Sequence, residues 1–437
     1  MHEKIIFFLT IASLLYFGFV LYLYGTPKAY LLGILYLLPF MNFLATKSNM
    51  GGFKVFDIVT FGSGFYLIRY FLIDNIIDKK YLHLLMFIIL MGIAITGSII
   101  SEHPGVSLVD TLKILPVFIY ARFLVLECIQ DEKFHYKIIK TLKTILGIAA
   151  VFLLIQLVVG IKFTFYSSLN INTFDPLRGA IRYPGYFNDS QVQGQFFAAG
   201  MLLFLYNPSG VTKRERWMNY FFFCIAFIAV YVSGSRSAFL GMAIGLFIAL
   251  ILIGRKYIIY LVILGAIAFP VITDYPNKSG VMSRSKDSSE DLKFRQSIWS
   301  EAYKIALKHP MLGIGSGNYL EYTMKHNPGQ YFELENNEIM YFDQPENGYL
   351  KILVEFGFIG FIAFLIIIIS PIFSSLALFF QNEVSPQIII IIASLFTWIV
   401  AFNTVYSLLD TRMLIMIATL IVLLLTFPKT AKHSELN

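Results

Sequence analysis

The sequence predicts an all-α, polytopic membrane protein, and three observations lead to this fold class. The chain has 437 residues, of which 57% are hydrophobic and only 14% charged, and its mean hydropathy is +0.71. A soluble domain carries about 25% charged residues. Apolar runs long enough to cross a bilayer as helices recur along the chain. These runs are continuous and do not alternate in polarity, which argues against an outer-membrane barrel.

The apolar runs define candidate spans, and we expect about 12–13 transmembrane helices because one early segment need not cross. The first run lacks a small-residue cleavage site, so we interpret it as a retained helix and not as a signal peptide. The two weakest runs are 56–73, which carries Asp57 and Arg69, and 192–206, which is short. The candidate spans lie near residues 5–24, 29–45, 56–73, 83–100, 106–129, 138–161, 192–206, 217–233, 237–254, 257–273, 357–380, 387–405 and 411–427.

One long polar stretch interrupts the spans and predicts a large loop outside the membrane. It divides the chain into N-terminal helices at 1–273, a loop at 274–346 and C-terminal helices at 347–437. Inside the loop, residues 288–309 have the periodicity of an amphipathic helix that Ser288 can cap and Pro310 ends. We expect its apolar face to rest on the membrane domain or at the membrane interface.

Lysine and arginine in short connections predict which side of the membrane each loop faces. They gather at 130–143, 207–217, 255–256 and in the C-terminal tail, which we interpret as cytoplasmic. Alternation then places residues 163–191, the turn at 234–237 and the loop 274–346 on the outer face. The net charge of +7 comes from these short loops and does not indicate a nucleic-acid partner.

Arg236 is the first candidate for binding an anion. It lies in the run Ser-Gly-Ser-Arg-Ser at 233–237, where one span ends and the next begins. Ser235 or Ser237 can cap the following helix. Free N–H groups at a helix start beside a guanidinium make a good phosphate site. The alternative is a flanking arginine that reaches out to lipid headgroups.

Three more arginines and one carboxylate lie on the same predicted face. Arg178 and Arg182 precede the span at 192–206, and Arg295 lies in the amphipathic helix. Their alternatives are an ordinary basic loop and a solvated helix face. Glu346 stands just before the chain re-enters the membrane, where a carboxylate can serve as a base for a hydroxyl proton or simply cap a helix.

The sequence gives no sign of a metal or nucleotide site. His309 and His326 are not spaced as metal ligands with a third residue. The glycine-rich run at 313–318 follows a helix ended by proline and not a strand, so we reject a phosphate-binding loop there.

The order and spacing of these motifs resemble the O-antigen ligase and O-antigen polymerase superfamily over residues 180–360. The matching motifs are R-x-x-G-x-F (Arg182, Gly185, Phe187), S-G-S-R-S (Ser233 to Ser237), R-x-x-x-W (Arg295, Trp299), P-x-x-G-I-G (Pro310 to Gly315) and E-N-x-Y-L-x-x-x-x-E-x-G (Glu346 to Gly357).

The resemblance implies a glycosyltransferase that needs neither metal nor cofactor and acts on the outer face of the bacterial cytoplasmic membrane. Its donor is a glycan on undecaprenyl diphosphate. Family ligases transfer that glycan to lipid A–core and usually show His-Asn where this chain has Glu346 and Asn347. This departure favours a polymerase of O-antigen, capsule or exopolysaccharide repeat units. A ligase acting on lipid A–core or on protein is the alternative.

The resemblance also implies roles for individual residues and partners. Glu346 and Arg236 are the expected catalytic residues. Substrate binding is expected of Arg178, Arg182, Arg236, Arg295, Asn347 and Tyr349. The expected partners are the lipid-linked donor and acceptor, the bilayer, a chain-length regulator and a flippase. A polysaccharide flippase or transporter is the rival from another class, but it does not explain a long ordered outer loop.

Overall fold

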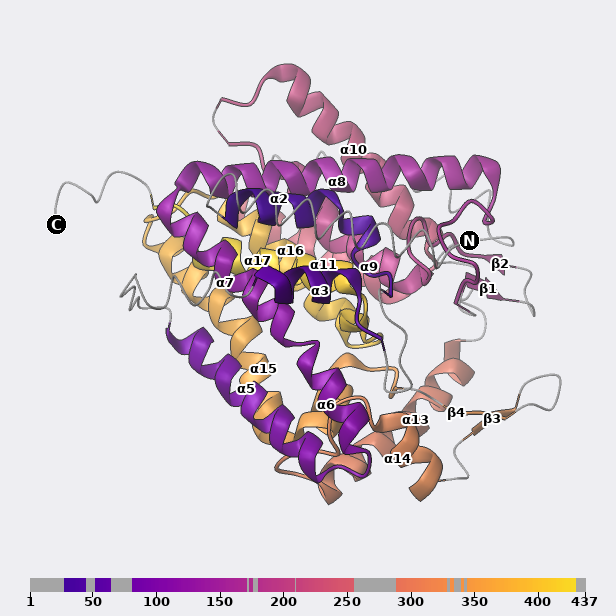
Figure 1. Ribbon diagram of the computed structural model, residues 1–437. Helices are drawn as coiled ribbons and strands as arrows, with labels where there is room; N and C mark the ends of the chain where they lie inside the picture. The colour runs from indigo at the N-terminus through magenta and orange to yellow at the C-terminus, as the bar shows by residue number, and fades with distance from the viewer. Residues whose placement is uncertain are drawn as a thin grey trace.

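The computed structural model is built almost entirely of helices (Figure 1). It describes residues 27–44, 52–63, 81–170, 173–175, 180–208, 210–254, 288–327, 331–333, 339–341 and 344–429. The helices are α2 (Pro27–Tyr36), η1 (Leu38–Phe40), α3 (Val55–Ser63), α5 (Tyr81–Ile100), α6 (Pro104–Leu112), α7 (Leu115–Gln130), α8 (Glu132–Val159), α9 (Ser190–Met201), η3 (Leu202–Leu205), α10 (Lys213–Val232), α11 (Arg236–Ile253), α13 (Ser288–Lys308), α14 (Tyr319–His326), α15 (Gly348–Phe380), α16 (Ile388–Phe402), η6 (Ser407–Leu409) and α17 (Thr411–Leu425). Two short hairpins pair β1 (Phe174–Asp175) with β2 (Ala180–Ile181) and β3 (Tyr331–Glu333) with β4 (Ile339–Tyr341).

The polytopic helical membrane fold is confirmed. Among the described residues, α8, α10, α11 and α15 are long and apolar enough to cross a membrane, and α5, α16 and α17 contain shorter apolar helices. The total of about 12–13 spans stays a prediction, because the predicted spans 5–24 and 257–273 lie outside the described residues. The division at residues 273 and 346 stays a prediction too.

Several predicted spans have different boundaries in the structure. The run 106–129 forms two helices, α6 and α7, with the break just before Pro116, which has no N–H to continue a helix. The run 192–206 is α9 followed by the 3₁₀ turn η3. Helix α2 ends at Tyr36, before Pro39, so the run 29–45 is shorter than a full span.

Helix α16 forms the centre of the membrane core. Every residue from Ile388 to Leu395 is buried, and α11 packs closely against it. Two glycines on α11, Gly241 and Gly245, allow this approach, since a Cβ on Gly245 would lie 2.9 Å from the Ala393 carbonyl oxygen. Small residues four apart are a common way for membrane helices to approach closely.

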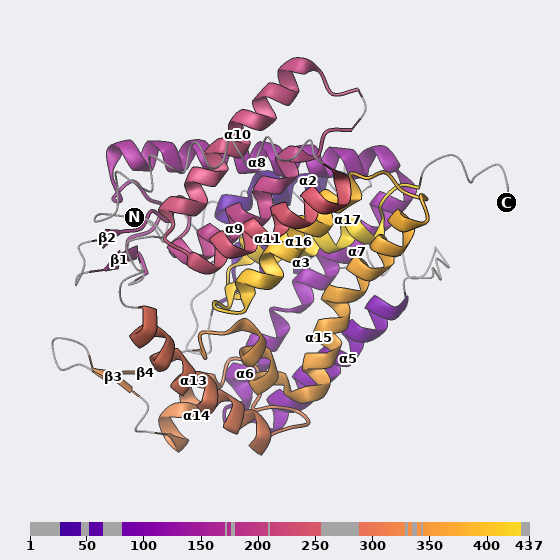
Figure 2. The same ribbon diagram turned by 180° about the vertical axis from the view of Figure 1, so that it is seen from behind.

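The described part of the long loop packs on the start of α15, and both views show α13, α14, β3 and β4 together at one end of the molecule (Figures 1 and 2). Helix α13 begins at Ser288 and ends before Pro310, as predicted. Its apolar face, with Ala302 and Ile305, contacts Leu353 and Val354 of α15. The expectation that this face rests on the membrane domain is therefore confirmed.

The turn after α13 fits a kink in α15. Gly357 lies within α15 but has φ 66° and ψ −175°, which only glycine adopts easily. The Phe358 N–H donates to the Pro310 carbonyl at 2.7 Å. A Cβ on Gly313 would lie 2.5 Å from the Val354 carbonyl oxygen. The glycines of P-x-x-G-I-G and E-x-G therefore hold the loop to the membrane helix.

Candidate functional site

Arg182 lies against the serine-rich turn that ends in Arg236. Ser235 caps α11, its hydroxyl oxygen accepting from the Ala238 N–H at 3.4 Å, as the sequence predicts. Gly234 has φ 68°, and a Cβ there would lie 2.9 Å from Cδ of Arg182. Arg182 is only 4% exposed, and Arg236 is the first residue of α11 and partly buried. The structure thus brings together two motifs that are more than 50 residues apart in the sequence.

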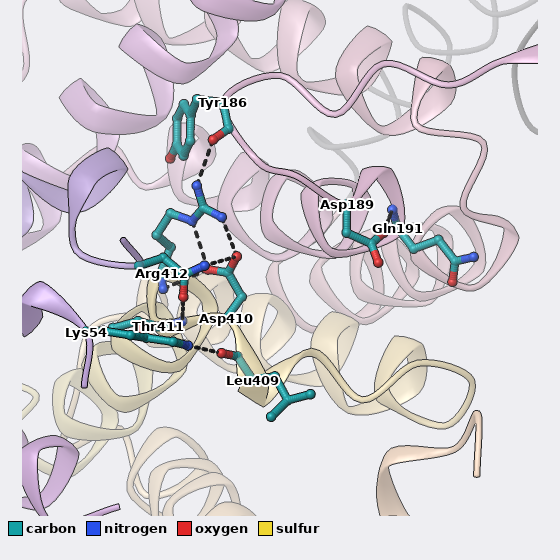
Figure 3. Close-up of polar contacts among 9 residues, drawn as sticks. Lys54, Tyr186, Asp189, Gln191, Leu409, Asp410, Thr411 and Arg412 are labelled. Atoms are coloured by element: carbon teal, nitrogen blue, oxygen red, sulfur yellow. Dashed lines mark hydrogen bonds and ion pairs between the residues drawn. The ribbon is translucent and has the colours of Figure 1, made fainter. Parts of the chain in front are cut away.

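A fully buried arginine, which the sequence analysis did not single out, holds the Arg182 loop in place (Figure 3). Arg412, in the first turn of α17, donates from Nη1 to the Tyr186 carbonyl at 2.7 Å. It donates from Nε to Asp410 Oδ1 at 2.8 Å and also pairs with Asp410 through Nη2. Its guanidinium carbon lies 4.0 Å from the centre of the Phe187 ring, a cation–π distance.

Asp189 is a second carboxylate near this loop. It caps α9, with Oδ1 accepting from the Gln191 N–H at 2.7 Å (Figure 3). Burial raises the pKa of Asp189 above its ordinary range, while the N–H groups at the start of α9 and the charge of Arg182 act in the opposite direction. The cap and the arginine charge therefore both favour the ionised carboxylate.

Arg295 and Glu346, from opposite ends of the loop, meet in the structure. Their atoms Nη2 and Oε2 are 3.6 Å apart, and each side chain is 24% exposed. Arg295 also donates from Nη1 to the Thr404 carbonyl at 3.3 Å. Glu346 has φ 50°, a left-handed conformation that is uncommon for a residue other than glycine. This pair combines a cation and a carboxylate that both remain in contact with solvent.

Asn347 and Tyr349 fix the backbone next to Glu346. Asn347 caps α15, and its Oδ1 accepts from the Tyr349 N–H at 3.0 Å. Its Nδ2 donates to Asn403 Oδ1 at 3.2 Å. The Tyr349 hydroxyl donates to the Ile399 carbonyl at 2.8 Å. In this state both side chains are engaged with the protein, so their predicted contact with substrate stays a prediction. Arg178 lies outside the described residues.

Residues 401–405, at the end of α16, connect the two arginine clusters. Thr404 in this segment accepts from Arg295. Gln195 of α9 donates to the carbonyls of Ala401 at 3.1 Å and Val405 at 3.4 Å. Beside it, a Cβ on Gly194 would lie 2.9 Å from Cβ of Ser235, the residue before Arg236. A short series of contacts therefore runs from the Arg236 turn through α9 to the Arg295–Glu346 pair.

The arrangement offers cations for an anionic group and one partly exposed carboxylate near them. Within the described ranges, no group of three His, Cys, Asp or Glu side chains is placed to hold a metal ion. The buried ion pair of Asp410 and Arg412 was missed because the candidate spans were read by hydropathy. Charged residues within an apolar segment are themselves a sign of function or of a buried pair, and the run LLDTRML carries that sign.

Comparison with known proteins supports the resemblance drawn from the motifs. Residues 221–365, about a third of the chain, match a family model described as O-antigen ligase. This region contains Arg236, Arg295 and Glu346, whereas Arg182 precedes it. None of the curated proteins compared with the chain matches it significantly. The predicted relation to the O-antigen ligase and polymerase superfamily is confirmed over the matched residues.

Proposed function

Because residues 221–365 match the O-antigen ligase family, we propose that this membrane protein is a glycosyltransferase that polymerises undecaprenyl-diphosphate-linked repeat units. The observation that carries the proposal is that contacts through α9 and residues 401–405 connect the Arg182–Arg236 cluster to the Arg295–Glu346 pair. A transferase of this kind needs cations for a leaving diphosphate and a carboxylate for an incoming hydroxyl. The described structure offers both, joined through residues 401–405.

The donor diphosphate is proposed to bind at Arg182 and Arg236. As the bond between the anomeric carbon and the diphosphate oxygen breaks, negative charge develops on that oxygen. Donors fixed before the reaction stabilise such charge most effectively. Arg236 stands at the N-terminus of α11, where the helix dipole also favours an anion.

The acceptor hydroxyl is proposed to bind at Glu346. Its oxygen forms a bond to the anomeric carbon on the face opposite the leaving diphosphate, so the configuration is inverted. The hydroxyl proton passes to the Glu346 carboxylate, and undecaprenyl diphosphate leaves with the bonding electron pair. Arg295, with its second contact to the Thr404 carbonyl, keeps the carboxylate in place. The reaction balances without a metal or a redox cofactor.

Glu346 favours the polymerase over the ligase. The resemblance places a histidine at this position in the ligases, and this chain has a glutamate. A ligase that transfers the glycan to lipid A–core or to protein is the second candidate, because the matched family model carries the ligase description. In either case we propose that the protein lies in the bacterial cytoplasmic membrane, with the site facing the periplasm or cell exterior. A flippase and a chain-length regulator are the proposed protein partners.

One reconstitution separates the candidates. Purified full-length protein receives lipid-diphosphate repeat units alone, and then with lipid A–core or an acceptor protein added. Longer lipid-linked chains in the first reaction support a polymerase, whereas products formed only with an added acceptor support a ligase. Movement of the lipid-linked glycan across liposomes without any new glycosidic bond would show a transporter and refute the enzyme.

Removing the proposed diphosphate ligand should stop chain growth. We expect Arg236→Ala to lower the rate about 10²- to 10³-fold, the usual loss for one transition-state donor, with no loss of folded protein. The measurement is chain length against time on gels, with thermal unfolding as the check on folding. Arg214→Ala is the matched control, since Arg214 is also in the first turn of a helix but is exposed at the start of α10. Equal activity of the two variants would remove the diphosphate role from Arg236.

A further inference from the structure

The described helices border a cavity of about 430 Å³. Its walls come from α3, α5, α6, α7, α15 and α17, with Trp398 of α16 and the turn before α17. None of its lining residues belongs to α9, α10 or α11 within the described chain. The cavity is therefore distinct from the cluster of Arg182 and Arg236.

The cavity is elongated, because its lining residues run along the whole of α17 and about half of α7. On α17 the lining residues follow helical spacing from Thr411 to Leu425, which is about 20 Å at 1.5 Å per residue. On α7 they run in the same way from Val117 to Val125. Apart from Arg122, the side chains along this length of α7 are apolar or aromatic. An extended hydrocarbon chain has the shape and polarity that this lining requires.

One end of the cavity is polar. Lys54, Asp57, Asp110, Lys113 and Ser316 line it. Asp110 is already engaged, accepting from Ser316 Oγ at 2.6 Å and pairing with Lys113 at 3.3 Å.

Lys54 supplies a cation at this end of the cavity. Its ammonium group donates to the Leu409 carbonyl (Figure 3), and its backbone N–H donates to Asp57 at 2.8 Å. Burial lowers the pKa of Lys54, and the charge of Asp410 acts in the opposite direction. A phosphate beside this ammonium would favour its charged form.

The polar end of the cavity adjoins the Arg295–Glu346 pair. Tyr406 and Leu409 line the cavity, and Thr404, two residues before Tyr406, accepts from Arg295. The turn at 403–410 is thus the wall between the two. A lipid whose chain occupied the cavity would carry its head group at the polar end, beside the turn that contacts Arg295.

We propose that this cavity binds the isoprenoid chain of the acceptor, a second polyprenyl-diphosphate-linked glycan, with its phosphates at Lys54 and Lys113. This inference rests on the proposed function and adds a location for the second substrate. A cavity of about 430 Å³ along α7 and α17 has room for part of one hydrocarbon chain, as a polyprenyl lipid has. The several acyl chains of a lipid A acceptor do not fit one such cavity.

Photolabelling tests the location without requiring turnover. The probe is undecaprenyl diphosphate with a diazirine on an isoprene close to the diphosphate, added to the full-length protein in nanodiscs and mapped by mass spectrometry. We expect labels on α7 and α17 at residues that line the cavity, and competition by unlabelled undecaprenyl diphosphate. Labels confined to α9–α11, or equal competition by phosphatidylglycerol, would overturn the proposal.

A blocking variant tests whether the cavity serves the acceptor. Ala121 lines the cavity, so Ala121→Trp should fill it, and Ile129→Trp on the same helix is the control because Ile129 is exposed and does not line it. Each buried CH₂ that the lipid loses is worth about a factor of four, so we expect labelling to fall at least about tenfold in Ala121→Trp alone. Ala418→Phe, from the opposite wall, provides a second blocking variant should the first fold poorly.

Kinetics with defined substrates separate this inference from the proposed function. The donor has its acceptor hydroxyl blocked, and the acceptor is carried on either undecaprenyl or geranyl diphosphate. In Ala121→Trp the KM for the undecaprenyl acceptor should rise about tenfold while the KM for the donor stays constant. With the geranyl acceptor, whose chain is too short to fill the cavity, the acceptor KM should be the same in Ala121→Trp and in the wild type. A wild-type enzyme that polymerises but shows no cavity labelling refutes only the inference. Cavity labelling without any transfer refutes the proposed function.

Discussion

The carboxylate of Glu346 is held from two directions. The Arg295 guanidinium lies 3.6 Å from it and is itself fixed by the Thr404 carbonyl. Behind it, Asn347 caps α15 and bonds to Asn403. A group that must accept a proton from a substrate hydroxyl needs such a fixed position, because misplacement lowers the effective concentration of the base.

Replacing the Glu346 carboxylate with an amide of the same shape should slow the chemical step. We expect Glu346→Gln to lower kcat about 10²- to 10⁴-fold with little change in the KM for the donor. Single-turnover transfer with a lipid-linked donor and acceptor is the measurement. Glu301→Gln is the control, since Glu301 lies on the same loop helix as Arg295 and pairs with Lys304. Normal single-turnover rates in Glu346→Gln would rule out its role as a base.

The ion pair of Asp410 and Arg412 should matter for stability more than any surface pair. Removing Arg412 leaves the carboxylate of Asp410 buried without its cationic partner. Arg412→Gln should therefore lower the free energy of unfolding by about 3–5 kcal/mol. Denaturant unfolding in detergent measures this. Lys429→Ala, which breaks an exposed pair with Glu383, should cost no more than about 1 kcal/mol. Equal losses in the two variants would contradict the structural role assigned to Arg412.

The sequence predicted the residues that stand at element boundaries and missed those defined by long-range packing. The cap at Ser235 and the stop before Pro310 are local features, and both are confirmed. The meeting of Arg295 with Glu346 depends on how the loop folds back, which local pattern does not specify. Arg412 was hidden in an apolar run, although its charge there was a usable signal.

At the scale of elements, the spacing of glycines decides how closely helices approach. Gly241 and Gly245 lie on one face of α11, four residues apart, directly against α16. Gly245 faces both Thr397 and the Ala393 carbonyl, so there is no room for a side chain.

Filling this contact should separate α11 from α16. Gly245→Leu should lower the free energy of unfolding by at least about 1–3 kcal/mol, because the backbone around an overpacked position must shift. Gly92→Leu on α5 is the matched control, since no atom lies within 4 Å of the position where its Cβ would be. Thermal unfolding in detergent compares them. Equal melting temperatures would show that the α11–α16 contact can relax without cost.

Helix lengths were harder to predict than helix positions. Hydropathy located α10 and α11 within about four residues at each end, whereas α8 begins six residues and α15 nine residues before the predicted spans. The predicted span 106–129 covers both α6 and α7. Apolar composition continues across the break between them, whereas Pro116 interrupts the helical hydrogen bonds. Hydropathy measures transfer into lipid, and it carries no information on where the backbone turns.

At the scale of the whole molecule, the proposed chemistry requires α13 and α14 to face the outside of the cell. We expect a cysteine at Met311, exposed beside α13, to react with a membrane-impermeant maleimide in intact cells. A cysteine at Trp217, exposed near the basic start of α10, should react only after the membrane is opened. Both variants are made after replacing Cys128 and Cys224 with alanine. The reverse pattern would invert the topology and exclude a donor on the outer face.

The segment at the end of α16 and before α17 binds three neighbouring side chains through its main-chain carbonyls. Gln195 binds the carbonyls of Ala401 and Val405, Arg295 that of Thr404, and Lys54 that of Leu409. A carbonyl oxygen is present whatever side chain the residue carries. Substitutions at 404 or 409 should therefore be tolerated over evolutionary time, whereas the insertion or deletion of one residue would move every carbonyl out of reach. Among homologues, we expect positions 404 and 409 to vary in residue type and the length of the segment to be constant.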